Sequence, residues 1–270
     1  MKNILARAQV STLLAFAKTR VLLAFDFDGT LAPIVRKPEA AAMRARTSRL
    51  LAEVARLYPC VVLSGRARAD VMTKVAAIPL RAVFGNHGME PSPGLRTWRQ
   101  QTDQSHAQLA SALPPIAGMV IENKGVSLAV HYRQARSHAV VRRQVLAVAA
   151  DLRGIRIIEG KMVVNILPAD APDKGSALIT LRKRLRCQAA IYVGDDDNDE
   201  DVFALAKTEH LLGIRIGRSR RSHAAYFVQN QAAIDQLLVK LAKARQPSKA
   251  TAPARPSKET QPRARFRREA

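Results

Sequence analysis

Five short, almost uninterrupted apolar runs constrain the fold of this chain more than any other feature. Continuous apolarity over about four to six residues is typical of strands that are buried on both faces of a parallel sheet. Segments with helical periodicity lie between the runs, which therefore alternate with helices along the sequence. The runs are Val21–Phe25, Cys60–Leu63, Arg81–Phe84, Ala189–Val193 and Leu211–Ile216.

Two of the intervening segments show a clear amphipathic pattern. Arg44–Leu57 places its leucines and Val54 on one helical face, and Lys174–Leu185 does the same with three leucines. Asp173 stands where the helix N-cap of the second segment is expected. Strand, loop and helix repeated in this order predict an α/β fold with a doubly wound, mostly parallel sheet as its core.

Residues 91–168 break this rhythm, which indicates an inserted α+β cap domain. We therefore predict a core at 1–90 and 169–242, a cap at 91–168 and a disordered basic tail at 243–270. The insertion holds two helix-like segments, at 98–111 and Val140–Ala150, and three strand-like segments, Met119–Asn123, Val126–Tyr132 and Ile155–Ile166.

The charge of the chain limits its partners. It carries 44 Lys and Arg against 22 Asp and Glu, a net charge of +22, which favours anionic partners such as nucleic acid, acidic membrane surfaces or phosphorylated metabolites. The aromatic content is 4%, and no RNP-like or helix-turn-helix pattern is present, so we expect only weak, non-specific polyanion binding by the tail. No apolar run approaches the roughly 20 residues of a membrane span, and no signal-like segment is convincing.

The two cysteines, Cys60 and Cys187, are far apart and belong to no CxxC or Cys/His cluster. This pattern argues against a disulfide scaffold or a zinc site and favours two reduced, buried thiols. Together with the absence of a membrane-spanning run, it leads us to expect a cytoplasmic monomer without membrane association.

Acidic and polar clusters follow three of the predicted strands, at the edge where an open α/β sheet places its ligands. Six carboxylates in the seven residues 195–201 repel one another unless a cation compensates, and Mg²⁺ with oxygen ligands suits such a site. A calcium loop is excluded, because Glu200 and Ala206 stand where glycine and glutamate are required. The clusters are Asp26–Thr30, Ser64–Arg66 and Gly194–Asp201.

These clusters suggest phosphoryl chemistry, although no Walker-type phosphate loop is present. Asp26, at a strand tip, could attack phosphorus as a carboxylate nucleophile. Asp28 could protonate the leaving oxygen and later deprotonate water. Ser64 could donate a hydrogen bond to a phosphate oxygen, and Lys174 offers a fixed cation at a helix start.

The ordered set DFDGT, LSGR, DKG and GDDDNDED resembles the four motifs of the haloacid dehalogenase superfamily of phosphohydrolases. Within it, the segments GNHGME (85–90), ENKG (122–125), HYR (131–133) and Gly160-Lys161 are similar to the trehalose-6-phosphate phosphatases. The resemblance implies an Mg²⁺-dependent hydrolysis of trehalose 6-phosphate to trehalose through an aspartyl-phosphate.

The same resemblance implies roles for individual residues. Asp26 would be the nucleophile and Asp28 the acid/base, with Ser64 and Lys174 holding the phosphoryl group. The Asp26 carboxylate, the Asp28 backbone carbonyl and Asp195 would bind Mg²⁺, and we expect Asp199, four residues after Asp195, to support the metal. The expected substrate-binding residues are Gly65, Arg66, His87, Glu122, Lys124, Arg133, Lys161 and Asn165.

The chain departs from the family pattern in the strand after Gly160-Lys161. Asn165 and Leu167 occupy the places of a usual glutamate and a basic residue, and Asn198 stands where threonine is common. These changes leave the phosphoryl chemistry intact but bear on the sugar. Another sugar-phosphate phosphatase, of the sucrose-phosphate or mannosylglycerate-pathway type, is therefore the alternative enzyme, and a nucleic-acid-binding protein acting through the tail is the alternative from another class.

Overall fold

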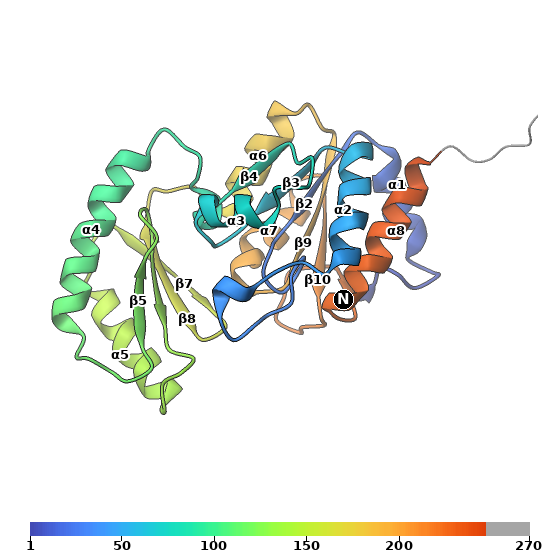
Figure 1. Cartoon of the computed structure of the whole chain (residues 1–270). Coiled ribbons are helices and arrows are strands. Elements are labelled where there is room, and N and C mark those ends of the chain that lie inside the picture. The colour runs from blue at the N-terminus through green and yellow to red at the C-terminus, as the bar shows by residue number, and fades with distance from the viewer. Residues whose placement is uncertain (247–270) are drawn as a thin grey trace, which may run out of the picture.

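A seven-stranded, wholly parallel sheet forms the core of the protein in the computed structural model, which describes residues 1–246 (Figure 1). Its order is β1-β11-β10-β9-β2-β3-β4. All five predicted strands are present, and three of them have the predicted bounds. The strands are β1 (Lys2–Asn3), β2 (Val21–Phe25), β3 (Cys60–Leu63), β4 (Ala82–Phe84), β9 (Ala189–Gly194), β10 (Leu211–Ile216) and β11 (Tyr226–Val228).

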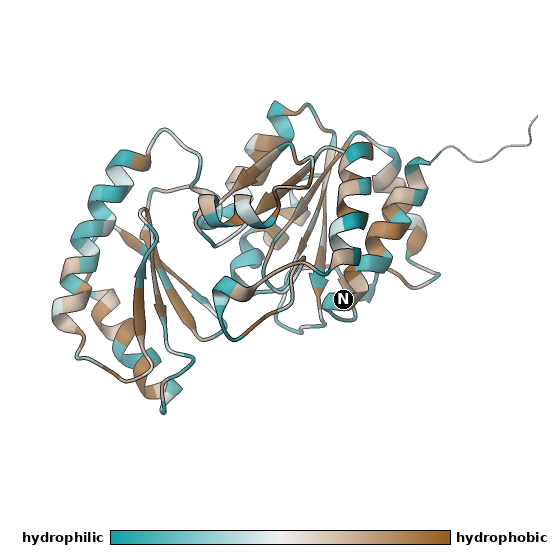
Figure 2. Ribbon diagram, viewed as in Figure 1, coloured by the Kyte–Doolittle hydropathy of each residue, from teal (hydrophilic) through white to brown (hydrophobic). Residues whose placement is uncertain are grey.

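Helices cover both faces of this sheet, which explains the continuous apolar runs. In β2, Leu23 and Phe25 pack into one apolar cluster, whereas Leu22 and Ala24 pack into another on the opposite face. Figure 2 shows the central strands as the most hydrophobic part of the core. The first cluster includes residues of α1 (Val10–Lys18), α2 (Ala45–Leu57), α3 (Arg68–Lys74) and α8 (Ile234–Arg245), and the second those of α6 (Lys174–Arg184) and α7 (Glu200–Ala204). The predicted doubly wound α/β fold is therefore confirmed.

The helix α6 begins where the sequence indicated. The Asp173 side chain accepts a hydrogen bond from the Ser176 N–H at 2.6 Å, and the Ser176 hydroxyl accepts one from the Asp173 N–H at 3.0 Å. This reciprocal capping box satisfies two N–H groups that have no partner within the helix. It fixes the start of α6, and hence Lys174, against the sheet edge.

The expected start of the tail at residue 243 is wrong by a few residues. The last helix, α8, continues to Arg245. The Arg245 guanidinium donates to the carbonyls of Ala17 and Thr19 at 3.2 and 2.6 Å and lies 4.4 Å from the centre of the Tyr58 ring. These contacts extend the helix beyond the last apolar residue of its pattern. Residues 247–270 lie outside the described part of the chain. The predicted disorder of the tail and its predicted binding of polyanions fall on these residues.

The order of the strands defines a switch point. From β2 the chain builds outward through β3 and β4, and it later returns to the other side of β2 to form β9, β10 and β11. Loops after β2 and β9 therefore diverge in opposite directions and leave a crevice at the carboxyl ends of the two strands. The Asp26 and Asp195 loops lie on either side of it.

A second, four-stranded antiparallel sheet of order β5-β6-β8-β7 forms from the chain between β4 and α6. One face of this sheet is covered by two helices, seen in green at the left of Figure 1, and buries residues such as Val130 and Val164. The elements of this unit are α4 (Leu95–Ala112), β5 (Val120–Asn123), β6 (Leu128–His131), α5 (His138–Ala150), β7 (Ile155–Gly160) and β8 (Val163–Pro168).

The single strand-like segment expected at Ile155–Ile166 is instead a hairpin of two strands. Gly160 pairs with Val163, so Lys161 and Met162 form a two-residue turn in which Met162 has φ = 64°. Glu159, Gly160 and Lys161 interrupt the apolar residues at this turn, so the sequence does carry a turn signal there. The hairpin places Lys161 at a tip rather than within a strand.

A small apolar cluster joins the loop after β4 to residues of the four-stranded unit and of the segment that leads from it to α6. It contains Met89, Trp98, Val126, Leu167 and Ala171, all buried. Polar contacts join the units beside it, because the Ser127 hydroxyl donates to the Asn86 side-chain oxygen at 2.7 Å. In residues 1–246, we find no helix of the length and apolarity that a membrane crossing requires.

Candidate active site

Three buried carboxylates converge at the carboxyl edge of the parallel sheet. Asp26 follows β2, whereas Asp195 and Asp199 follow β9, and each places a carboxylate oxygen within 4.8 Å of the other two. All three residues are at most 5% exposed. Such a cluster of hard oxygen donors fits a divalent cation that prefers oxygen ligands.

Lys174, at the first turn of α6, supplies a permanent positive charge to this cluster. Its Nζ atom donates to Asp26 Oδ1 and Asp199 Oδ1, both at 2.7 Å, and to Asn198 Oδ1 at 2.9 Å. Although burial favours the neutral amine, Asp199 and Asp26 hold the pKa of Lys174 above its usual value. Lys174 is therefore an ammonium that is fixed beside Asp26.

Asp199 is held by four donors, which defines its role. Its Oδ1 atom accepts from Lys174 and from the Tyr192 hydroxyl at 2.6 Å, and its Oδ2 atom accepts from the N–H groups of Asp195 and Asp196 at 2.7 and 3.0 Å. Burial would raise the pKa of Asp199, but the Lys174 charge and these donors hold it below the usual range. A carboxylate offers about four acceptor positions, and here all are used.

Asp26 and Asp195 differ from Asp199 in this respect. Burial raises the pKa of Asp26 well above its usual range, with Lys174 opposing and the neighbouring carboxylates adding to the rise. Burial likewise raises the pKa of Asp195 to about 6, against the lowering effect of Lys161. These two carboxylates are under-compensated by the hydrogen bonds around them, which makes them the better candidates for metal ligands.

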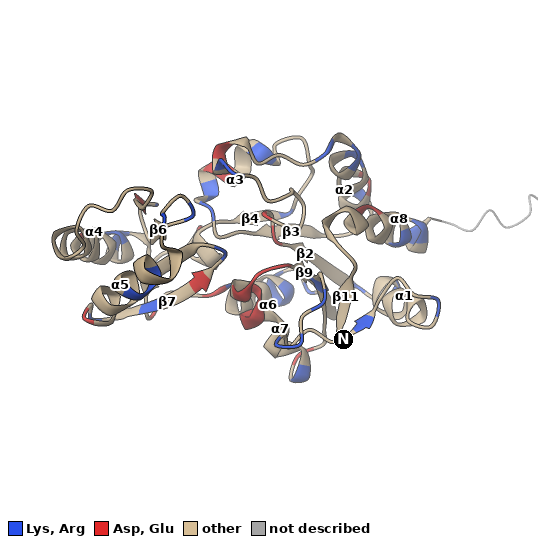
Figure 3. Ribbon diagram, turned by 90° about the horizontal axis from the view of Figure 1, so that it is seen from below, with Lys and Arg blue, Asp and Glu red and all other residues tan. Residues whose placement is uncertain are grey.

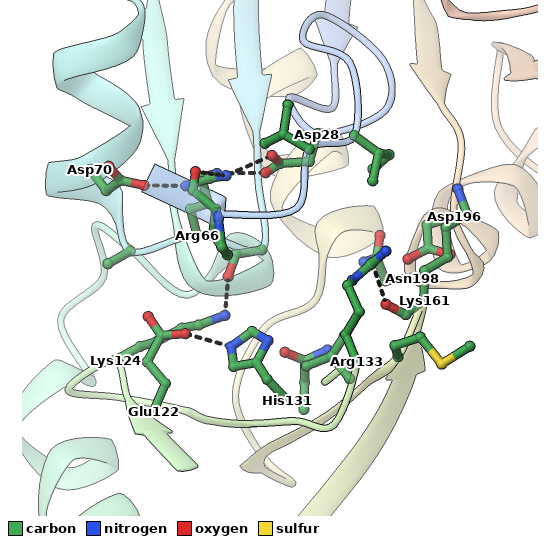
Figure 4. Close-up of a pocket in the computed structure, with 18 of the residues that line it drawn as sticks. Asp28, Arg66, Asp70, Glu122, Lys124, His131, Arg133, Lys161, Asp196 and Asn198 are labelled. Carbon is green, nitrogen blue, oxygen red and sulfur yellow. Dashed lines mark hydrogen bonds and ion pairs between the residues drawn. The ribbon is translucent and has the colours of Figure 1, made fainter. Parts of the chain in front are cut away.

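A pocket of about 350 Å³ opens above this cluster, between the core and the four-stranded sheet (Figure 4). This volume lies within the usual range of small-molecule sites. Ten of the predicted site residues line it, whereas Ser64, Lys174, Asp195 and Asp199 do not line it and are buried. The ten are Asp26, Asp28, Gly65, Arg66, His87, Glu122, Lys124, Arg133, Lys161 and Asn165.

Asp28 is engaged by an arginine on the next loop. Arg66 donates to both carboxylate oxygens of Asp28, at 2.6 and 2.7 Å, and also to Asp70 Oδ2 at 2.7 Å (Figure 4). The Ser64 hydroxyl accepts from the Arg66 N–H at 3.2 Å and so shapes the loop that carries the guanidinium. Bidentate pairing of this kind fixes the geometry of both groups.

His87 stands out among the pocket residues. It is 2% exposed, and neither ring nitrogen has a hydrogen-bond partner among residues 1–246. Its φ of 59° lies in the left-handed region, as does that of Asn86 at 45°, which histidine and asparagine tolerate better than most residues. Burial lowers the pKa of His87 well below its usual value, as do the charges of Lys124 and Lys174. The neutral ring therefore offers one donor and one acceptor to a ligand.

The cap residues reach the pocket from one face of the small sheet. Glu122 on β5 accepts a hydrogen bond from His131 Nε2 on β6 at 2.8 Å, and Lys124 Nζ donates to the Gly65 carbonyl at 3.1 Å (Figure 4). The Arg133 guanidinium donates to the Lys161 carbonyl at 3.0 Å. The longest of these contacts, between Lys124 and Gly65, joins residues that are 59 positions apart in the sequence.

The three departures from the family pattern have different locations. Asn165 lines the pocket, is 4% exposed, and donates from its side-chain nitrogen to the Ile158 carbonyl at 3.2 Å. Asn198 also lines the pocket, whereas Leu167 lies in the apolar cluster with Met89 and Trp98. The changes at Asn165 and Asn198 therefore reach the space that a substrate would occupy, and the change at Leu167 does not.

Six polar pocket residues lie outside the predicted site residues, namely Arg36, Glu39, Asp70, His131, Asp196 and Asn198. Strand alternation would have revealed His131, because Val130 beside it is buried against the helices and the next side chain must face the pocket. Asp70 lies four residues after Arg66, which is the spacing of helical ion pairs. Asp196 and Asn198 belong to the predicted acidic cluster Gly194–Asp201.

Fold and site together define a haloacid dehalogenase-like α/β protein, with a carboxylate–lysine cluster at the sheet switch point and an α+β insertion above it. Residues 24–232 match the sequence profile of the family described as "Trehalose-phosphatase". The chain therefore belongs to the trehalose-phosphatase family.

Relatives in sequence support this membership. A Zea mays trehalose 6-phosphate phosphatase is 32% identical, covering 90% of this chain and 76% of the relative. A Mycobacterium ulcerans trehalose-phosphate phosphatase is 36% identical over 66% of this chain and 50% of the relative. A Mycobacterium tuberculosis protein, named an uncharacterized glycosyl hydrolase, is 35% identical over 87% of this chain, which spans 19% of that much longer protein.

Solved structures share the fold. The C-terminal domain of the Candida albicans trehalose-6-phosphate phosphatase superposes with a TM-score of 0.69 at 20% identity, covering 86% of this chain and 96% of that one. An Aspergillus fumigatus trehalose-6-phosphate phosphatase superposes with a TM-score of 0.60 at 24% identity, covering 90% and 100%. At these identities the likeness establishes the common architecture.

Proposed function

We propose that this protein is an Mg²⁺-dependent phosphatase that removes phosphate from trehalose 6-phosphate and releases trehalose. The observation that carries the proposal is the Asp26–Lys174 pair, which lies within a buried carboxylate cluster below a pocket in a chain of the trehalose-phosphatase family. A carboxylate beside a fixed ammonium suits nucleophilic attack on an anionic phosphate.

In the proposed reaction, an oxygen of Asp26 attacks phosphorus and the bond between phosphorus and the sugar oxygen breaks. Asp28 gives its proton to that oxygen, so trehalose leaves and an aspartyl-phosphate remains on Asp26. Asp28 then takes a proton from water, which attacks phosphorus and regenerates Asp26. Because Arg66 occupies both oxygens of Asp28, Asp28 must exchange this partner before it can transfer a proton.

The residues present fit a divalent cation. The Asp26 and Asp195 carboxylates and the Asp28 backbone carbonyl would hold Mg²⁺, while Asp199, whose acceptor positions are taken, would orient Lys174 and the Asp195 loop. When bound, the metal would neutralise negative charge on the phosphate and on the attacking carboxylate. Lys174 and Ser64 would hold the phosphoryl oxygens.

The four-stranded unit would act as the cap that recognises the sugar. His87, Glu122, Lys124, Arg133, Lys161 and Asn165 would contact hydroxyl groups, because they line the pocket and carry donors and acceptors. The unpartnered nitrogens of His87 support this role, since a buried polar atom without a partner costs about 1–3 kcal/mol unless a ligand satisfies it. Asn165 would bond a hydroxyl more weakly than a carboxylate, because charge-assisted bonds are roughly twice as strong.

We also propose that the enzyme works in the cytoplasm as a monomer. Cys60 and Cys187 are both buried and unbonded to each other, which suits a reducing compartment.

A substrate panel tests the proposed selectivity. Phosphate release should be measured from trehalose 6-phosphate, sucrose 6-phosphate, a mannosylglycerate phosphate and glucose 6-phosphate, with Mg²⁺ and with EDTA. We expect the highest kcat/KM for trehalose 6-phosphate and loss of activity in EDTA. A preference for sucrose 6-phosphate or the mannosylglycerate phosphate would leave the phosphatase assignment standing and overturn the substrate.

A further inference from the structure

Lys161 joins the two units of the molecule at the carboxylate cluster. It lies at the tip of the β7–β8 hairpin, and its ammonium forms an ion pair with Asp195 Oδ2 on the core. The Lys161 side chain is 49% exposed, whereas that of Asp195 is 4% exposed. Figure 3 shows the end of β7 directed toward the acidic segment that follows β9. A half-exposed cation of the four-stranded unit thus reaches a buried anion of the core.

Two lysines contact different members of the carboxylate cluster. Lys174 contacts Asp26 and Asp199, and within residues 1–246 no bond from it to Asp195 is present. Asp195 is instead contacted by Lys161 at Oδ2 and by the Thr30 hydroxyl at Oδ1, at 3.4 Å. Lys161 therefore supplies the charge that Lys174 does not bring to Asp195.

The other cations near Lys161 have carbonyl partners. Arg133 donates to the Lys161 backbone carbonyl and so holds the hairpin turn, whereas Arg215 donates to the Asp196 carbonyl of the core at 3.2 Å. Neither contact occupies the Lys161 ammonium. The ammonium can therefore leave Asp195 without dismantling the turn that carries it.

We infer that Lys161 and the divalent cation compete for Asp195, so that metal binding and the contact between the hairpin tip and the core oppose one another. This inference rests on the proposed function, which makes Asp195 a metal ligand. Two cations at one carboxylate repel each other at short range. Because coupling between two binding events is reciprocal, the ion that loosens Lys161 is itself bound more weakly while Lys161 is present.

The competition gives Lys161 a role in timing. Once displaced from Asp195, its ammonium remains at the pocket wall and is available to an anionic sugar phosphate. Lys161 would then bind the substrate only after the metal occupies its site. The contact between the four-stranded unit and the substrate would therefore depend on metal binding to the core. Lys161 is therefore a positioning residue, because metal binding at Asp195 determines whether the tip of the β7–β8 hairpin contacts the core.

The test is the Mg²⁺ affinity of the full chain, measured by calorimetry without substrate. Lys161→Met and Lys161→Gln both remove the competing charge, and we expect each to bind Mg²⁺ about 3- to 10-fold more tightly than the wild type. Lys37→Met is the matched control, because Lys37 is exposed and neighbours the pocket residues Arg36 and Pro38 without contacting Asp195. Its affinity should stay within about twofold of the wild type.

Hydrogen exchange supplies a second readout. Saturating Mg²⁺ should speed exchange at residues 158–164 in the wild type and leave it unchanged in Lys161→Met. Equal Mg²⁺ affinities in the wild type and both Lys161 variants would overturn the inference alone. If Lys37→Met increased the Mg²⁺ affinity as much as the Lys161 variants do, direct competition for Asp195 would be wrong. The increase would then come from the lower net positive charge of the protein. If neither wild type nor variants bind Mg²⁺, the inference and the proposed metal site fail together.

Discussion

Asp26 and Asp28 lie two residues apart, but their surroundings separate their roles. Asp26 is buried beside Lys174 within the carboxylate cluster, whereas Asp28 faces the pocket and is held by Arg66. The first arrangement fixes a nucleophile next to positive charge. The second keeps an acid/base group at the side from which the sugar oxygen would leave.

Substitution of these two aspartates should separate the two steps. Asp26→Asn should abolish phosphate release from trehalose 6-phosphate, because an amide does not form the acyl-phosphate. Asp28→Asn should still bind substrate but slow turnover by about 10²–10⁴-fold through loss of the general acid. Steady-state kinetics, with circular dichroism to check folding, measure both. Near-normal turnover by Asp26→Asn would show that the mechanism is wrong.

His87 should make stability depend on pH. Its folded-state pKa lies well below its usual value, so it is neutral when folded and takes up a proton on unfolding in mild acid. Its contribution is therefore complete above about pH 6.5 and is lost as pH falls below that value. Between pH 7 and 5, the free energy of unfolding of the wild type should fall by up to about 2 kcal/mol more than that of His87→Asn. Asparagine is the chosen substitute because it tolerates the same φ.

Urea unfolding at the two pH values measures this difference, since titration of the shared carboxylates cancels between the proteins. If both proteins lost the same free energy of unfolding, His87 would titrate normally and would not be buried as a neutral ring.

At the scale of elements, the predictable parts were those with a strong local pattern. The bounds of β2, β3 and β10 follow from continuous apolar runs, and α6 follows from its leucines and the Asp173 cap. The outermost strand β1 and its neighbour β11 have two and three residues, too few for any periodicity. They exist because neighbouring strands pair with them, which no local pattern can show.

In the candidate site, too, some residues could be located from a local sequence pattern and others could not. Asp26 and Asp28 could be located because polar residues at strand ends meet at one edge of a parallel sheet. The pairs Lys161–Asp195 and Lys124–Gly65 depend instead on how two separately folded units pack, and their members are 34 and 59 residues apart. The resemblance to a family placed these lysines near the substrate, but their core partners required the structure.

The end of α8 should be a measurable boundary. Truncation after Gln246 should leave the free energy of unfolding and the activity unchanged, because the described contacts of α8 end there. Truncation after Ala242 removes the Arg245 contacts with Ala17, Thr19 and Tyr58 and should cost about 1–3 kcal/mol. Arg245→Ala in the full chain should reproduce most of that loss. Equal stability of the two truncations would contradict this account.

The junction between the two sheets can be followed through Trp98, the single tryptophan of the chain. Leu167→Arg, which places a basic residue where the family usually has one, would put a charge among Met89, Trp98 and Val126. We expect a loss of more than about 3 kcal/mol of stability and a red shift of tryptophan emission. Leu167→Met, which conserves volume, should cost less than about 1.5 kcal/mol. Unchanged emission in Leu167→Arg would mean that the junction is not packed as described.

At the scale of the whole molecule, the pocket is assembled from segments that lie far apart in sequence. Asp26, the proposed nucleophile, follows β2, Lys174 begins α6, and the residues proposed to face the sugar come mostly from the four-stranded unit between them. The net charge of +22 favours the encounter with an anionic substrate. Hydrolysis then depends on bringing phosphate to one carboxylate at the sheet edge while the insertion holds the sugar.

The central claim is that phosphate passes from trehalose 6-phosphate to Asp26. Its most direct test is acid quenching of a single turnover with phosphate-labelled substrate and Mg²⁺, followed by peptide mapping of the protein. We predict transient label on the peptide that contains Asp26, sensitive to hydroxylamine as an acyl-phosphate is, and no label on Asp26→Asn. Free phosphate that appears without labelled protein, and at the same rate in Asp26→Asn, would contradict the account.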